Sequence, residues 1–87
     1  MGFSEADKGY MSLVLYEAML ASEKTLSPNS IVIVENGIIA VASNHESKSS
    51  INELIQEYEH RIKEKATLYT FRKPEGELSG KIGRIVY

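Results

Sequence analysis

Two short apolar runs, residues 31–34 and 38–42, lie close together on either side of Asn36 and Gly37 in the middle of the chain. Most of their residues are β-branched, which favours strands. An Asn-Gly pair readily supplies the two positive φ angles that the type I′ turn of a two-residue hairpin loop requires. The pattern therefore predicts an antiparallel β-hairpin over residues 31–42.

A two-residue loop would also fix the pairing of the two strands. The predicted pairs are Val34–Ile39 and Val32–Val41 on one face, and Ile33–Ala40 and Ile31–Ala42 on the other. Because both faces are apolar, both have to be covered in the folded protein. The small side chains of Ala40 and Ala42 leave room on their face for a closely packed helix.

The segment before the hairpin has a helical pattern over residues 5–24. Ser4 is placed as an N-cap, with Asp7 where the acid of a capping box would stand. Gly9 costs about 1 kcal/mol relative to alanine in a helix, which leaves open a later start near Tyr10. From there to residue 21 the apolar positions exceed one stripe. We therefore expect this helix to be buried from two sides or partly covered by another chain.

A second helix is predicted from residue 51 to about residue 65. Ser50 and Glu53 have the spacing of a capping box at its start. Its apolar residues recur at the spacing of a single helical stripe. They are Ile51, Leu54, Ile55, Tyr58 and Ile62.

Two further strands are predicted at residues 67–72, which Pro74 closes, and at residues 81–87, which Gly83 weakens. The element order is then α-β-β-α-β-β. We expect residues 1–87 to form a single α+β domain, with two helices on a mostly antiparallel sheet of three or four strands. The second helix would cover one face. The first would cover the other face, or lie beside the second and leave that face to a partner chain.

Composition narrows the class of protein without naming its activity. The chain has 87 residues, 43% of them hydrophobic and 25% charged, as in ordinary globular domains. It has no cysteine, which favours a reducing compartment, and we expect a cytoplasmic protein that does not engage a membrane. The net charge of −2 is unevenly spread. Residues 1–60 carry three lysines against nine acids, whereas residues 61–87 carry seven cations against three acids.

Tests for chemistry along the chain give no catalytic, metal or cofactor site. Glu57, His60 and Glu64 have helical metal-ligand spacing, but a di-metal bundle needs matching ligands from other helices. The loop at residues 76–81 lacks the Ser or Thr after Lys81 and the helix that a phosphate loop requires. We therefore predict that the protein is not an enzyme and binds no metal or cofactor.

Two binding hypotheses remain. The first is a non-enzymatic protein-binding or regulatory module that forms a homodimer. Its predicted contact residues are Leu13, Tyr16, Leu20, Val32, Val34, Ile39 and Val41, and burial in the chain's own core is an equally good interpretation of them. The alternative is single-stranded nucleic-acid binding, in which aromatic side chains stack on bases and cations hold phosphates. Its predicted residues are Arg61, Lys65, Tyr69, Phe71, Arg72, Lys73, Lys81 and Arg84.

Overall fold

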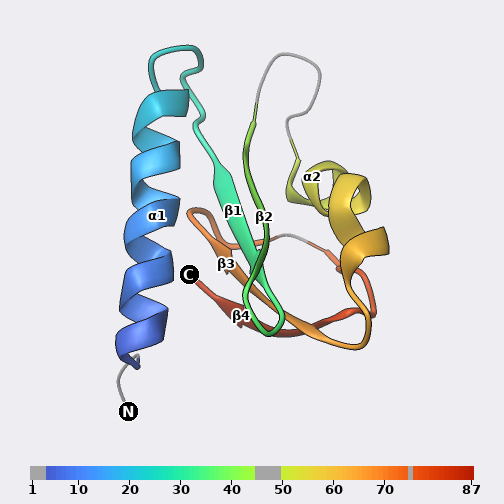
Figure 1. Cartoon of the computed structure of the whole chain (residues 1–87). Helices are drawn as coiled ribbons and strands as arrows, with labels where there is room; N and C mark the ends of the chain where they lie inside the picture. Colours follow the sequence, from blue (N-terminus) through green and yellow to red (C-terminus); the bar gives the residue numbers. More distant parts are fainter. Residues whose placement is uncertain (1–3, 45–49, 75) are drawn as a thin grey trace.

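In the part of the chain that the structure describes, two helices, a short 3₁₀ turn and four strands follow the predicted order α-β-β-α-β-β (Figure 1). The computed structural model describes residues 4–44, 50–74 and 76–87. Its elements are α1 (Glu5–Ala21), β1 (Ser30–Val34), β2 (Ile38–Ser43), α2 (Ile51–Tyr58), the 3₁₀ turn η1 (Glu59–Arg61), β3 (Ala66–Thr70) and β4 (Ile82–Val86). The two C-terminal strands thus lie within two residues of their predicted bounds.

The four strands form one sheet in the order β2-β1-β3-β4. β1 pairs antiparallel with β2 and with β3, whereas β3 pairs parallel with β4. The prediction of a mostly antiparallel sheet in an α+β fold is therefore confirmed. β2 and β4 are the two edges of the sheet, and α1 and α2 lie on its opposite faces (Figure 1).

The hairpin forms where it was predicted, but its connection has three residues rather than two. Glu35 leaves the strand because its carboxylate accepts hydrogen bonds from the main-chain N–H groups of Lys63 and Glu64, both at 2.8 Å. A bulge follows, and Val34 stands opposite Ile38. The predicted Val34–Ile39 pair is therefore wrong. The other three predicted pairs are confirmed.

One half of the core lies between α2 and the sheet. It contains the buried side chains of Ile31, Ile33, Ala40, Ile51, Leu54, Ile55, Ile62, Ala66 and Leu68. The predicted stripe of the second helix is thus confirmed, with Tyr58 partly buried at its margin. Ala40 and the half-buried Ala42 lie on this face, where small side chains let α2 approach β2 closely.

The second helix is shorter than the predicted range to residue 65. It ends at Tyr58, η1 follows, and Ile62 is already extended at φ −82° and ψ 123°. The main-chain N–H groups beyond this point bond the Glu35 carboxylate, so they are not free to continue a helix. Lys81 satisfies the carbonyls of Glu59 and Ile62 through its Nζ, at 3.3 and 3.2 Å.

The other half of the core lies under α1, which covers the second face of the sheet. Val14, Val32, Tyr69 and Val86 are buried there. This settles the open alternative for the first helix, which does not lie beside α2. The helix begins at Glu5 with the predicted Ser4–Asp7 capping box, and Gly9 lies within it. It ends at Ala21 rather than near residue 24, because Ser22 caps it and a turn follows.

Candidate interaction surface

The outer side of α1 is apolar along its C-terminal half. Leu15, Tyr16, Met19 and Leu20 are between 41% and 64% exposed. They form two i, i+4 pairs, so they lie side by side on the helix. The residues that α1 buries in this half are smaller: Val14, Ala18 and Ala21. The helix therefore turns its small apolar side chains inward and its large ones outward.

The hairpin adds apolar side chains on the face that α1 covers. Ile38 is 52% and Val41 36% exposed, and the half-buried Val34 packs against the cluster under α1. Val41 pairs with Val32, which fixes it on this face, and Ile38 pairs with Val34. α1 contacts β1, β2 and β3 but leaves part of β2 uncovered.

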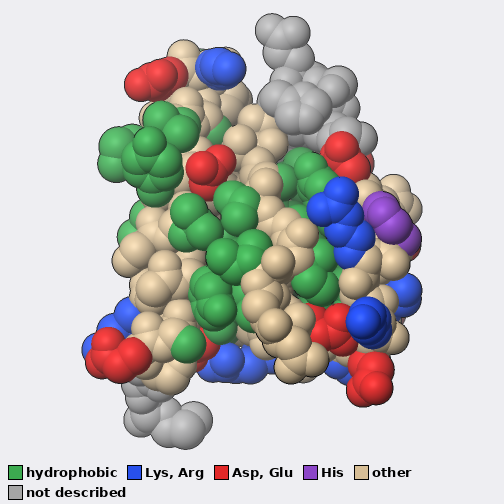
Figure 2. Space-filling model, viewed as in Figure 1, with side chains coloured by type: hydrophobic (Ala, Val, Ile, Leu, Met, Phe, Trp, Pro, Cys, Tyr) green, Lys and Arg blue, Asp and Glu red, His purple; other side chains and the backbone are tan. Residues whose placement is uncertain are grey.

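The hairpin side chains lie beside one flank of α1, the flank that carries Leu13, Tyr16 and Leu20. Figure 2 shows hydrophobic side chains over the upper part of α1 and in the middle of the molecule, where β2 runs between the two helices. Leu13 and Val34 both pack against the cluster under α1, which joins the helix to the hairpin. We call this region the α1–hairpin surface. It consists of Leu13, Tyr16, Leu20, Val34, Ile38 and Val41.

Two of the residues predicted to contact a partner lie elsewhere. Val32 is fully buried beneath α1 and is a core residue, because α1 covers this face of the hairpin. Ile39 packs against the cluster under α2. The cause is the bulge at Val34, which moves Ile38 into the place expected for Ile39. Ile38 was missed for that reason. Leu15 and Met19 were missed as well, although their i, i+4 spacing signals a further apolar side of α1.

A polar cluster fixes the N-terminal end of α1 to the sheet. The Asp7 side chain is 3% exposed and pairs with both terminal nitrogens of Arg84, at 3.1 and 2.7 Å. Tyr69 donates its hydroxyl hydrogen to the same carboxylate at 2.5 Å, and the Tyr10 ring lies 5.1 Å from the Tyr69 ring. The main-chain N–H of Ser4 donates to it at 3.2 Å. The Asp7 carboxylate thus accepts hydrogen bonds from Tyr69 of β3 and from Arg84 of β4, and these bonds tie α1 to both strands.

The ionisation of this cluster follows from its contacts. The hydrogen bonds from Arg84 and Tyr69 hold the pKa of Asp7 well below its ordinary value. The bond to Asp7 raises the pKa of Arg84. Burial, together with the anionic neighbour, raises the pKa of Tyr69 to about 12. The carboxylate therefore stays charged and the phenol neutral near neutral pH, as suits a structural cluster rather than a proton-transfer site.

Most of the residues proposed for nucleic-acid binding make contacts within the chain. Tyr69 is buried under α1, and Arg84 is bound to Asp7. Four of the remaining side chains donate to main-chain carbonyls. Lys65 donates to Gly80, and Lys81 donates to Glu59 and Ile62. Arg72 donates to Pro28, and Arg61 donates to Ile39. Phe71 and Lys73 are exposed.

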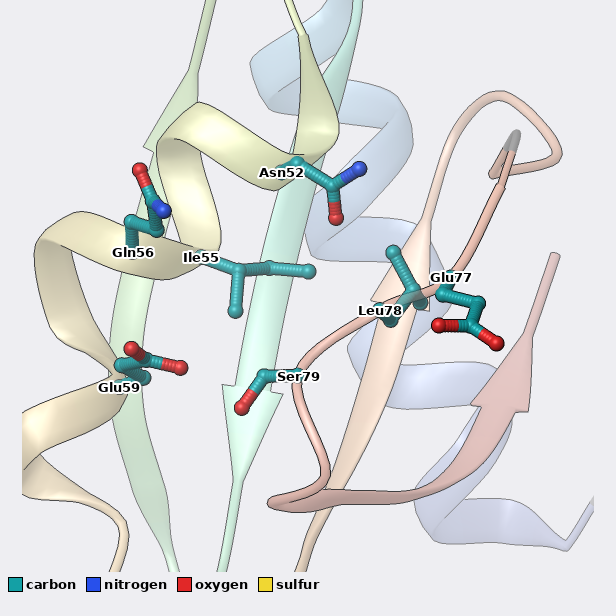
Figure 3. Close-up of a pocket in the computed structure, with 7 residues that line it drawn as sticks. All are labelled: Asn52, Ile55, Gln56, Glu59, Glu77, Leu78 and Ser79. Carbon is teal, nitrogen blue, oxygen red and sulfur yellow. The ribbon is translucent and has the colours of Figure 1, made fainter.

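A pocket of about 470 Å³ lies between α2, η1 and the loop before β4 (Figure 3). Its lining residues are Asn52, Ile55, Gln56, Glu59, Glu77, Leu78 and Ser79. Ile55 points from α2 toward the loop, whereas the Glu77 carboxylate is directed away from α2 (Figure 3). The polar groups thus do not converge on a single point, as they would around a bound small molecule.

Within the described residues, no group of three or more His, Asp or Glu side chains is placed to hold a metal ion. Comparison with protein-family models, curated proteins and solved structures gives no match to this chain. None of the described helices combines the length and the apolar character needed to cross a membrane. The α1–hairpin surface is therefore the candidate site that the geometry itself supplies.

Proposed function

We propose that this chain is a non-enzymatic binding module that works as a homodimer through the α1–hairpin surface. The observation that carries the proposal is the outward placement of large apolar side chains on α1, beside exposed Ile38 and Val41. A contiguous apolar patch on a small protein typically marks a site of association, because leaving it in water costs free energy.

The size of this surface suits association of two copies. Tyr16, Leu20, Ile38 and Val41 together expose about as much as two fully exposed large side chains, roughly 300–400 Å² of apolar area at 150–200 Å² each. A standard interface buries about 800 Å² per partner, of which somewhat more than half is apolar. The patch alone supplies somewhat less apolar area than such an interface contains.

The contacts around Tyr69 favour protein binding over nucleic-acid binding. A base could stack on Tyr69 only if the ring left the core and its bond to Asp7. The Arg84 guanidinium is already paired with the same carboxylate, which offsets its charge toward a phosphate. We further propose that the protein works in a reducing compartment such as the cytoplasm, since its 87 residues contain no cysteine.

Sedimentation equilibrium over the micromolar range tests the proposal. The 9.7-kDa chain is expected to approach twice its monomer mass as concentration rises. Leu20→Arg places a charge within the surface and should keep the protein monomeric. Leu15→Arg is the matched control, because Leu15 is similarly exposed but lies on the opposite side of α1 from Leu13 and Leu20.

Three results would contradict the proposal. The first is a wild-type chain that remains monomeric at every concentration. The second is a Leu20→Arg variant that is folded by circular dichroism and still dimerises. The third is equal loss of the dimer in both arginine variants, which would mean that charge anywhere on α1 is enough.

A further inference from the structure

β2 is an edge strand whose outer main-chain groups can be assigned. The N–H of Asn44 donates to the carbonyl of Asn29 at 3.0 Å, which makes this a hydrogen-bonded pair. Bonded and non-bonded pairs alternate along antiparallel strands. By that alternation Ala42 and Ala40 bond to β1, while Val41 and Ser43 direct their N–H and C=O groups outward. Ile39 is the extra residue of the bulge, so the alternation does not extend to it.

Ile39 has a contact outside the sheet instead. A guanidinium nitrogen of Arg61, in η1, lies 3.5 Å from its carbonyl oxygen. Among the described strands, β2 has a neighbour on one side only.

The two edges of the sheet differ in chemistry. β2 has the sequence Ile-Ile-Ala-Val-Ala-Ser, with no charged residue and no proline. β4 carries Arg84, and Gly83 interrupts its run of side chains. Charge and short or irregular strands are the usual means by which an edge avoids pairing with another chain. β4 has such protection at its centre. Within β2 the irregularity is the bulge at Ile39, so the stretch from Ala40 to Ser43 is a regular, uncharged edge.

We propose that β2 pairs antiparallel with β2 of a second copy, about a two-fold axis at Val41. In this register Val41 stands opposite the partner's Val41, and Ile39 opposite the partner's Ser43. Val41 would exchange two main-chain hydrogen bonds with the partner's Val41, and the outward groups of each Ser43 would face the partner's bulge at Ile39. The inference rests on the proposed homodimer and specifies how its two sheets join into one.

The same symmetry accounts for the exposed apolar side chains. A two-fold axis perpendicular to the sheet keeps both copies of α1 on the same face. The flanks that carry Leu13, Tyr16 and Leu20 then face each other across the joined hairpins, above Ile38 and Val41. Sheet pairing thus adds main-chain bonds to an apolar area that is small by itself, as in other cases of strand addition at an edge.

Single cysteines give a sharp test, because the chain has none of its own. In the proposed register the two Val41 Cα atoms lie about 5.5 Å apart, within the range that a disulfide spans. Val41→Cys should therefore form a covalent dimer under mild oxidation. Ser43→Cys is the matched control on the same edge. Its two copies would be staggered by four residues, about 13 Å, and should cross-link much more slowly.

A second pair of variants tests the main-chain bonds directly. Val41→Pro removes an N–H that faces outward and leaves the bonds to β1 in place, so the chain should fold and remain monomeric. Val41→Thr keeps the N–H and the β-branched shape, and should still dimerise. If Val41→Pro does not fold, Val41→Lys provides the same test through a charge at the edge.

The outcomes separate this inference from the proposed function. A monomeric wild type overturns both. A wild-type dimer in which Ser43→Cys cross-links as fast as Val41→Cys, or in which folded Val41→Pro still dimerises, overturns the strand pairing alone. A folded Val41→Lys variant that still dimerises overturns both, because Val41 also belongs to the α1–hairpin surface. Fast cross-linking of Val41→Cys together with monomeric Val41→Pro supports both.

Discussion

The two helices solve the same packing problem in opposite ways. α2 has eight residues, and its large aliphatic side chains, Ile51, Leu54 and Ile55, are buried against the sheet. α1 has 17 residues but buries only Val14, Ala18, Ala21 and the carboxylate of Asp7. The large apolar side chains of its C-terminal half, Leu15, Tyr16, Met19 and Leu20, are exposed. The apolar pattern of α2 is explained by this one chain, whereas that of α1 is not.

The difference also shows in how each helix is attached. α2 is held by interdigitated aliphatic side chains in the larger cluster. α1 depends at its N-terminal end on a polar contact of Asp7 with Tyr69 and Arg84, and further along on Ser30, whose hydroxyl donates to the carbonyl of Val14 at 2.6 Å. In the proposed dimer, the flank of α1 that carries Leu13, Tyr16 and Leu20 meets the second copy.

The largest expected effect contrasts one leucine from each helix. Leu54→Ala removes a buried side chain and should lower the free energy of unfolding by about 2–5 kcal/mol. Leu15→Ala removes a side chain that is already half in water, and should cost about 1 kcal/mol or less. Urea unfolding of the dilute, monomeric protein measures both. Equal losses would show that α1 is packed as tightly as α2.

A smaller effect on stability is expected when the contact of Asp7 that attaches α1 to the sheet is removed. Because the pKa of Asp7 is lowered in the folded state, its ionised carboxylate stabilises the fold above about pH 4. This contribution to the free energy of unfolding is lost as the pH falls below that value. Asp7→Asn should lower the midpoint of thermal unfolding at pH 7 by about 4–8 °C. It should also weaken the loss of stability between pH 4 and pH 2 relative to the wild type.

The neighbouring acid provides the control for this experiment. Glu5→Gln changes an exposed carboxylate on the same helical turn, 3.7 Å from Lys8, and should leave the pH profile almost unchanged. Glu35 contributes some acid sensitivity in every variant, since the main-chain N–H groups of Lys63 and Glu64 lower its pKa. Identical profiles for Asp7→Asn and the wild type would mean that Asp7 does not anchor α1.

Local patterns in the sequence predicted most of the fold. The α2 stripe, the Ser4–Asp7 capping box and the Asn36-Gly37 turn each depend on neighbours along the chain, so their elements could be found. The end of α2 and the bulge at Val34 could not. Both depend on the bond from Glu35 to residues 63 and 64, nearly thirty positions away, and no local pattern shows that contact.

The candidate site was predictable only in part for the same reason. The second apolar flank of α1 is visible in the spacing of Leu13, Tyr16 and Leu20. Which hairpin residues accompany it depends on the register, and the bulge exchanges Ile39 for Ile38. The sequence pattern also groups Tyr69 and Arg84 with a basic, aromatic surface. Their contact with Asp7, 62 and 77 residues away, is not visible in any local pattern.

The smallest expected effect comes from the part of α1 that lies outside the proposed contact. Met19 is 64% exposed, and Met19→Gln exchanges it for another unbranched residue of similar helix propensity. We expect the free energy of unfolding of the dilute protein to change by no more than about 0.5 kcal/mol. The dimer should also persist in sedimentation, because Met19 is turned away from the flank that carries Leu13 and Leu20. If Met19→Gln dissociates the dimer as fully as Leu20→Arg, the two copies meet through the outer side of α1, and the hairpin has no part in the contact.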